Sequence, residues 1–107
     1  MSDRNFVLLE GTVCSEPKLK DTPKSRLLMF RVATQREGMK FPERNNVKAW
    51  GDQPRVSEGD RVEVRGILKT EKYGDEDNPK FWTGCVADTI RVLGAAGPDE
   101  DDDDLPF

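Results

Sequence analysis

The chain has 107 residues, enough for one modest domain and too few for two, and its hydrophobic content of 35% indicates that part of it lies outside a packed core. No apolar stretch approaches the roughly 20 residues of a membrane span, and the N-terminal MSDRN lacks the apolar region of a signal peptide, so we expect a soluble cytoplasmic protein. Six acidic residues at 99–104 explain the net charge of −4, because the rest of the chain carries 17 basic and 15 acidic side chains and can attract a polyanion.

Five segments carry the signals of β-strands, and most of them alternate apolar and polar residues as half-buried strands do. In chain order they are residues 6–13, 26–34, 46–50, 61–70 and 81–93. The third segment sets Val47 and Ala49 against Lys48 and Trp50. The apolar face of the fourth runs from Val62 to Leu68.

The connections between these segments are rich in glycine, proline and small polar residues, and no segment has a sustained helical period. Gly11, Gly66 and Gly84 interrupt strands, which suits the bends of a small coiled barrel, although a weakly packed strand position explains each equally well. The predicted fold is all-β, a five-stranded antiparallel barrel of the oligonucleotide/oligosaccharide-binding (OB) type. An SH3-like barrel would give much the same pattern.

The composition changes after Leu93, where a GAAGP segment precedes the acidic run and the chain ends in Leu105, Pro106 and Phe107. Glycine and proline end the last strand, and six adjacent like charges repel one another. We therefore predict a domain over residues 1–93 and a flexible acidic tail over 94–107.

No metal site or cofactor is predicted, because histidine is absent and Cys14 and Cys85 match no metal-binding spacing. In a reducing compartment both cysteines are expected as buried thiols rather than as a disulfide. The chain lacks a nucleophile–base pair, so we do not expect an enzyme, although barrels of this type can host nucleases.

Binding a single strand without sequence preference requires cations for phosphates and exposed aromatic faces for bases. Trp50 lies on the polar face of its strand, Tyr73 lies at the end of a strand in a loop too polar to bury it, and either Trp82 or Phe81 must face outward. A partly buried packing role is the alternative for each. The candidate single-stranded DNA-binding residues are Trp50, Tyr73, Trp82, Lys48, Lys72, Arg31, Arg44, Lys69 and Lys80.

Motifs along nearly the whole chain resemble those of bacterial single-stranded DNA-binding proteins. They are NFVLLEGTV with the following EP, MFRVAT, VKAWG, EGDRVEVRGILKTEKY, and DDDLPF at the C-terminus. The resemblance implies stacking aromatics at Trp50, Tyr73 and Trp82. It also implies a partner-binding tip formed by Asp102, Asp103, Asp104, Leu105, Pro106 and Phe107.

The sequence departs from the family pattern at three points. Arg44 and Met39 stand where the family usually has tryptophans, and the family's helix between the third and fourth strands is reduced to residues 52–58. Fewer stacking faces imply weaker binding per domain, and the lost helix and short linker speak against the family's usual tetramer. A compact, virus-encoded version would explain these departures.

The expected function is sequence-tolerant single-stranded DNA binding, with recruitment of replication, recombination or repair proteins through the tip. Phe107 joins an aromatic ring to the terminal carboxylate, which suits an apolar pocket rimmed by cations, whereas a merely solubilising tail would not explain the LPF ending. The alternatives are a primosome-accessory or RNA-binding OB protein and a pure protein-interaction module. A homodimer or another homo-oligomer is compatible with the sequence.

Overall fold

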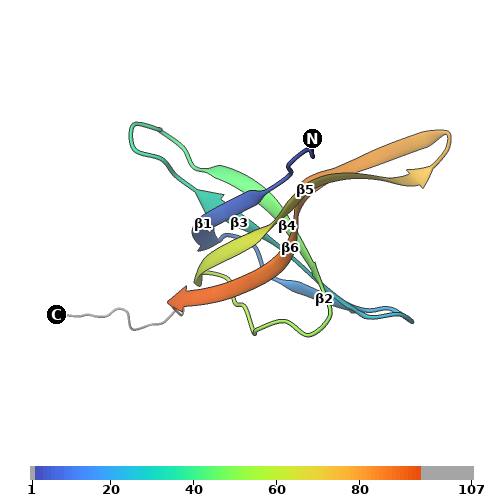
Figure 1. Cartoon of the computed structure of the whole chain (residues 1–107), viewed down its shortest axis with the longest axis horizontal. Helices are drawn as coiled ribbons and strands as arrows, with labels where there is room; N and C mark the ends of the chain where they lie inside the picture. Colours follow the sequence, from blue (N-terminus) through green and yellow to red (C-terminus); the bar gives the residue numbers. More distant parts are fainter. Residues whose placement is uncertain (1, 95–107) are drawn as a thin grey trace.

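The computed structural model describes residues 2–94, and within this range the chain forms six β-strands and no helix (Figure 1). The strands are β1 (Val7–Val13), β2 (Lys18–Asp21), β3 (Arg26–Thr34), β4 (Glu43–Trp50), β5 (Arg61–Asp75) and β6 (Asn78–Gly94). All five predicted strands are present. The additional strand β2 has four exposed residues, KLKD, so it carries no alternation of apolar and polar side chains that could reveal it.

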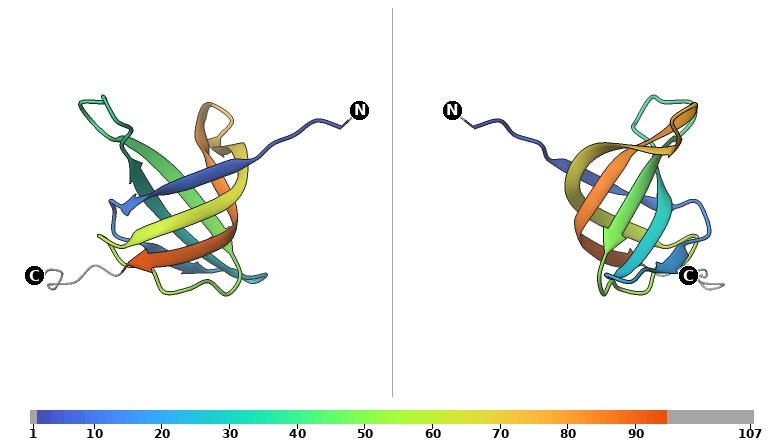
Figure 2. Two further views of the ribbon diagram at one scale, coloured as in Figure 1. Left: turned by 60° about the vertical axis from the view of Figure 1, so that its left-hand side comes forward. Right: turned by 90° about the vertical axis from the view of Figure 1, so that its right-hand side faces the viewer.

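The strands form one sheet that closes on itself (Figure 2). The order is β1-β5-β6-β4-β3-β2, and β1 also pairs with β3 through Thr12↔Ala33 and Val13↔Val32, which closes the ring. This arrangement confirms the predicted all-β class. One pairing differs from the antiparallel prediction, because β4 and β6 run parallel where the β3–β4 and β5–β6 hairpins meet.

The interior of the ring is filled mainly by small branched side chains. The largest fully buried side chains are five valines, and Phe30 is the one aromatic ring of the described core. The buried hydrophobic cluster comprises Val13, Leu28, Phe30, Val32, Val47, Ala49, Val56, Val62, Val64, Cys85, Ala87 and Ile90. The inward face predicted for the third segment, Val47 and Ala49, is therefore correct, and Val7 and Leu9 of β1 pack against the cluster.

The fourth segment departs from its predicted alternation, since Leu68 is 55% exposed. Beyond Gly66 the β5–β6 ladder leaves the ring and continues to Asp75↔Asn78. Residues 67–83, which we call the projecting hairpin, extend away from the ring on the same side as the β3–β4 loop (Figures 1 and 2). None of their side chains is buried, because neither face of the hairpin meets the core.

The cysteine prediction is half correct. Cys85 is buried in the core, and burial raises the pKa of its thiol, with Asp88 adding to the effect. Cys14 is only partly buried, because it directly follows β1, where the chain leaves the ring; both are free thiols.

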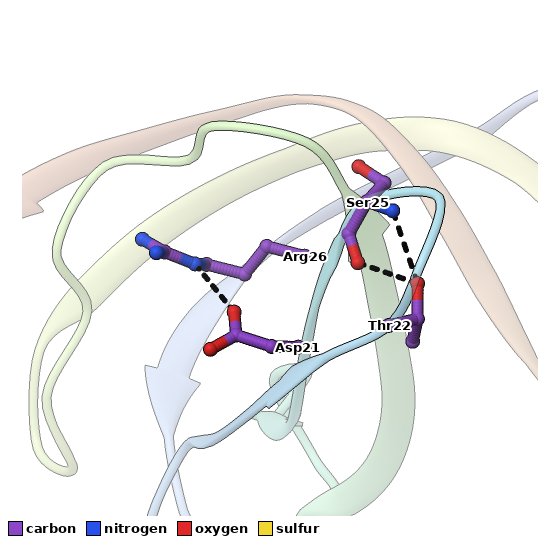
Figure 3. Close-up of polar contacts among 4 residues, drawn as sticks. All are labelled: Asp21, Thr22, Ser25 and Arg26. Carbon is purple, nitrogen blue, oxygen red and sulfur yellow. Dashed lines mark hydrogen bonds and ion pairs between the residues drawn. The ribbon is translucent and has the colours of Figure 1, made fainter.

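A polar turn fixes the β2–β3 hairpin (Figure 3). The Thr22 hydroxyl donates to the Ser25 carbonyl at 2.5 Å and accepts from the Ser25 amide at 3.0 Å, while Arg26 pairs with Asp21 at 3.0 Å. These contacts hold β2 along β3 with Lys18 opposite Met29. Residues on directly opposed positions share a face, so β2 adds its lysine side chains to the outer face of β3.

The connection from β4 to β5 contains no helix, as its sequence predicts. Within residues 2–94 the structure holds no helix with the length and apolarity of a membrane span. The predicted tail lies outside the described residues, apart from Gly94, which ends β6.

Gly66 allows β5 to bend against β6. A Cβ atom at this position would lie 2.1 Å from the Val86 carbonyl oxygen, next to the register shift between Arg65 and Gly66. We expect Gly66→Ala to lower the free energy of unfolding by about 1–3 kcal/mol, measured by urea denaturation. Gly94→Ala is the control, because its Cβ would meet only Arg61 at 3.9 Å; equal stabilities of the two variants would contradict this account.

Candidate nucleic-acid interface

A cleft of about 410 Å³ lies between the outer face of β3 and β4 and the projecting hairpin. We call it the hairpin cleft. Its lining residues are Ser15, Glu16, Lys18, Met29, Phe30, Arg31, Asn46, Val47, Tyr73, Phe81 and Trp82. Three aromatic residues of the hairpin thus line a cleft to which the opposite wall contributes Lys18 and Arg31, the combination that stacking and phosphate binding require.

A larger hollow of about 940 Å³ lies between the β2–β3 hairpin and the connection that follows β4. No aromatic residue lines it, and its acidic residues Glu16, Asp52 and Glu58 outnumber Arg26 and Arg55. It offers a single strand neither a stacking face nor an excess of positive charge. The hairpin cleft is therefore the better candidate for nucleic acid.

Trp82 lines the hairpin cleft, and its ring lies against Lys48 of β4. Lys48 is on the outer face of β4, as predicted, but it is only 9% exposed. Its Nζ lies 4.2 Å from the centroid of the Trp82 ring and forms an ion pair with Glu71 of the hairpin. Lys69 reaches the other oxygen of the same carboxylate at 3.6 Å.

The hydrogen bond from Lys48 lowers the pKa of Glu71 from its ordinary value of 4.5, with further lowering by Lys69 and opposition from burial. A carboxyl group whose pKa is lowered by folding stabilises the fold at pH values above the unfolded pKa, and this contribution is lost as the pH falls through the folded pKa. The Glu71–Lys48 pair is therefore intact at neutral pH.

Arg31 is held in place on the opposite wall. Its Nε donates to Asn46 Oδ1 at 3.2 Å, and its backbone amide donates to the Ser15 hydroxyl at 2.9 Å. The Asn46 side chain also donates to the Thr83 carbonyl at 3.0 Å, so it connects Arg31 to β6. The backbone of Asn46 lies too close to Gly84 for a side chain there, since a Cβ would sit 2.4 Å from the Asn46 carbonyl oxygen.

The six predicted cations fall into two groups. Lys48 and Lys69 both pair with Glu71. Arg31, Arg44, Lys72 and Lys80 form no ion pair with any carboxylate among residues 2–94, so their charges are available to an incoming phosphate.

The predicted site residues do not all lie at the hairpin cleft. Tyr73, Trp82 and Arg31 line it, and Lys80 lies opposite Tyr73 in the β5–β6 ladder. Trp50 is 46% exposed, two residues along β4 from Lys48. Lys72 pairs across the ladder with Phe81, whereas Arg44 lines a separate hollow of about 170 Å³.

Sequence reasoning overlooked two residues of this surface. Phe81 lines the cleft and is 64% exposed. The alternation of side chains along the strand predicted that only one of Phe81 and Trp82 faces outward. Phe81 is exposed because the hairpin has left the ring, whereas Trp82 lies against Lys48 of β4 and is only partly exposed. Glu71 carried no signal in the sequence, since its function depends on the partners from β4 and β5 that the fold brings to it.

No group of three or more His, Cys, Asp or Glu residues that could hold a metal ion occurs within residues 2–94.

Solved structures with the same arrangement of strands include the N-terminal domain of PriB from Thermoanaerobacter tencongensis, described as dimeric. It has a TM-score of 0.68 and 17% identity, over 85% of this chain and 98% of that chain. A Plasmodium falciparum SSB in complex with ssDNA has a TM-score of 0.66 and 20% identity, over 89% and 97%. These likenesses confirm the predicted OB-type fold.

A search among curated proteins gave no significant match. The model of the single-strand binding protein family, in contrast, matches residues 4–93, which include every strand up to Leu93 and the whole hairpin cleft. The chain belongs to the single-strand binding protein family.

Proposed function

We propose that the chain binds single-stranded DNA without sequence preference in the hairpin cleft and over the adjoining face of Trp50. The observation that carries this proposal is the meeting of Tyr73, Phe81 and Trp82 with the unpaired cation Arg31 across one cleft. Membership of the family supports the ligand, and so does the ssDNA complex of the Plasmodium relative.

The cleft suits a single strand better than a duplex. Stacking needs the flat face of an unpaired base, and each base on an aromatic side chain contributes about 1–3 kcal/mol. Duplex DNA covers those faces with neighbouring base pairs. Phosphates would then lie against Arg31 and Lys18 on one wall and against Lys80 and Lys72 on the hairpin.

Binding should depend strongly on salt, because the unpaired lysines and arginines replace phosphate counterions. The logarithm of the association constant with oligo-dT should fall linearly with the logarithm of salt concentration, by about 0.7 for each phosphate contacted. With Arg31, Lys72 and Lys80 all engaged, the slope should be about −2 or steeper. Fluorescence titrations at four salt concentrations measure it, and salt-independent binding would exclude a phosphate backbone as the ligand.

A primosome-accessory or RNA-binding protein is the second candidate, favoured by the likeness to the PriB domain. Competition between oligo-dT and oligo-rU of equal length distinguishes the two. Preference for oligo-dT supports the first proposal, and preference for oligo-rU supports the second.

We further propose that Asp102, Asp103, Asp104, Leu105, Pro106 and Phe107 form a tip that binds replication, recombination or repair proteins. These residues lie outside the described range, so the proposal rests on their chemistry: four consecutive aspartates are followed by the apolar side chains of Leu105, Pro106 and Phe107. A basic protein surface with an apolar pocket would complement them.

The acidic tail should also compete with the strand for the cleft. The six carboxylates at 99–104 belong to the same chain as Arg31 and Lys18, so their effective concentration for the cleft is high. Deleting residues 99–107 should leave the affinity for oligo-dT equal or higher, most clearly at low salt where screening is weakest. A clear loss of affinity on deletion would show that the tail contributes to strand binding.

A homo-oligomer is the remaining part of the proposal, and the dimeric PriB domain supports it. Light scattering with and without an oligo-dT strand tests this part. A mass that stays that of one chain at all concentrations would overturn it.

A further inference from the structure

We propose that Glu71 is a positioning residue of the hairpin cleft, which holds the Lys48 ammonium against the Trp82 ring so that Lys48 supports base stacking instead of binding a phosphate. The inference rests on the proposed function, because it assumes that Trp82 receives a base. The sequence predicts Lys48 as one of six DNA-binding cations. The inference gives it a different role from the exposed ones.

The burial of Lys48 is the first argument. Its side chain is 11% exposed, whereas the lysine beside it on the same carboxylate, Lys69, is 53% exposed. A phosphate exchanges counterions with cations that water can reach. Lys48 is covered by the Trp82 ring and paired with Glu71, so its charge is already neutralised inside the protein.

The position of the ammonium over the ring is the second argument. A cation within about 6 Å of a tryptophan centroid is attracted to the ring, most strongly where water is excluded. At 4.2 Å, Lys48 restricts the orientation of Trp82 before any ligand arrives. A side chain that is already ordered loses less conformational entropy on binding, so the strand meets a ring held in place.

Glu71 is what keeps the ammonium there. Without its carboxylate, a nearly buried ammonium would have no counter-charge, which is strongly unfavourable. Lys48 would then turn towards water. This movement would uncover the Trp82 ring and place a new cation where a phosphate can reach it.

The chain provides a matched control on the same strand. Glu63 of β5 is also largely covered, with its side chain 14% exposed, and it pairs with Arg65 and Arg91, each at 3.4 Å. Glu71 pairs with the lysine that lies over the Trp82 ring, whereas Glu63 pairs with two arginines that have no contact with that ring. Glu63→Gln therefore changes the net charge as Glu71→Gln does and breaks ion pairs of the same kind, at a distance from the site.

The first measurement is the salt dependence of oligo-dT binding by the full chain. Lys48→Met should weaken binding by about 2- to 30-fold, the range of a cation–ring contact, and leave the salt slope unchanged. With Lys69→Met as the background, so that Lys48 is the one cation released, Glu71→Gln should steepen the slope by about 0.7, because Lys48 gains a phosphate. Glu63→Gln should leave the slope unchanged.

The second measurement reports on Trp82 directly in the free protein. With Trp50→Phe as the background, Trp82 is the only tryptophan of the chain. Both Glu71→Gln and Lys48→Met should increase the quenching of its fluorescence by acrylamide, and Glu63→Gln should not. If Glu71→Gln does not fold, adding Lys48→Met removes the unpaired ammonium, and in the Lys69→Met background the variant should show the salt slope of Lys48→Met.

Two results would overturn the inference. A slope made shallower by about 0.7 in Lys48→Met would make Lys48 a phosphate contact. Unchanged quenching of Trp82 in both Glu71→Gln and Lys48→Met would show that the pair does not position the ring. A different result would overturn the proposed function, namely no binding of oligo-dT by the wild-type protein. The quenching measurement would still test the role of Glu71, because it uses the free protein.

Discussion

Replacing both Trp50 and Trp82 with alanine should weaken oligo-dT binding by about 2–6 kcal/mol, since each stacked base contributes about 1–3 kcal/mol. Trp50 alone should account for about 1–3 kcal/mol of this loss, with little effect on the fold, because its ring is 46% exposed. Fluorescence anisotropy with a labelled oligo-dT strand measures the affinities. Adding strand to the wild-type protein should also quench its tryptophan fluorescence.

Leu8→Ala is the control for these substitutions. Leu8 is an apolar side chain on β1, 52% exposed, which lines none of the described clefts. Its removal should leave the affinity unchanged. An unchanged affinity of the double tryptophan variant, together with no quenching in the wild type, would refute stacking as the mode of binding.

Deleting Phe107 alone should abolish the recruitment of a tip-binding partner while strand binding barely changes. The deletion removes one aromatic ring, yet all six acidic side chains at 99–104 remain. A pull-down from host lysate with full-length and Phe107-deleted baits measures the difference. Identical partner sets from the two baits would mean that the tip serves only solubility.

The strands of the ring could be predicted from sequence because each has one face on the core. The alternation of apolar and polar residues in β4 predicts that Val47 and Ala49 are buried, and both are. Strand β2 could not be predicted in this way, because an exposed edge strand needs no apolar face. The parallel pairing of β4 with β6 could not be predicted either, because strands that are far apart in the chain leave no local sequence pattern when they pair.

The candidate site was predictable in its residue types and not in its contacts. Exposed aromatics beside cations indicated a single-strand binder, and Tyr73, Trp82 and Arg31 do line one cleft. The burial of Lys48 could not be foreseen, because it depends on Trp82 and Glu71, which contact it from the projecting hairpin. The rule of alternation also failed where the hairpin leaves the ring, since Leu68 then has no core to enter.

The central claim is that the strand lies in the hairpin cleft, and a nuclear magnetic resonance titration with oligo-dT tests it most directly. We expect the indole signal of Trp82 and the amide signals of Arg31, Asn46 and Tyr73 to shift as strand is added, because these residues line the cleft. The amide of Glu63, remote from the cleft on the same strand as Tyr73, should stay in place. Shifts confined to the larger hollow around Arg26 and Val56, with Trp82 and Tyr73 unaffected, would contradict the claim.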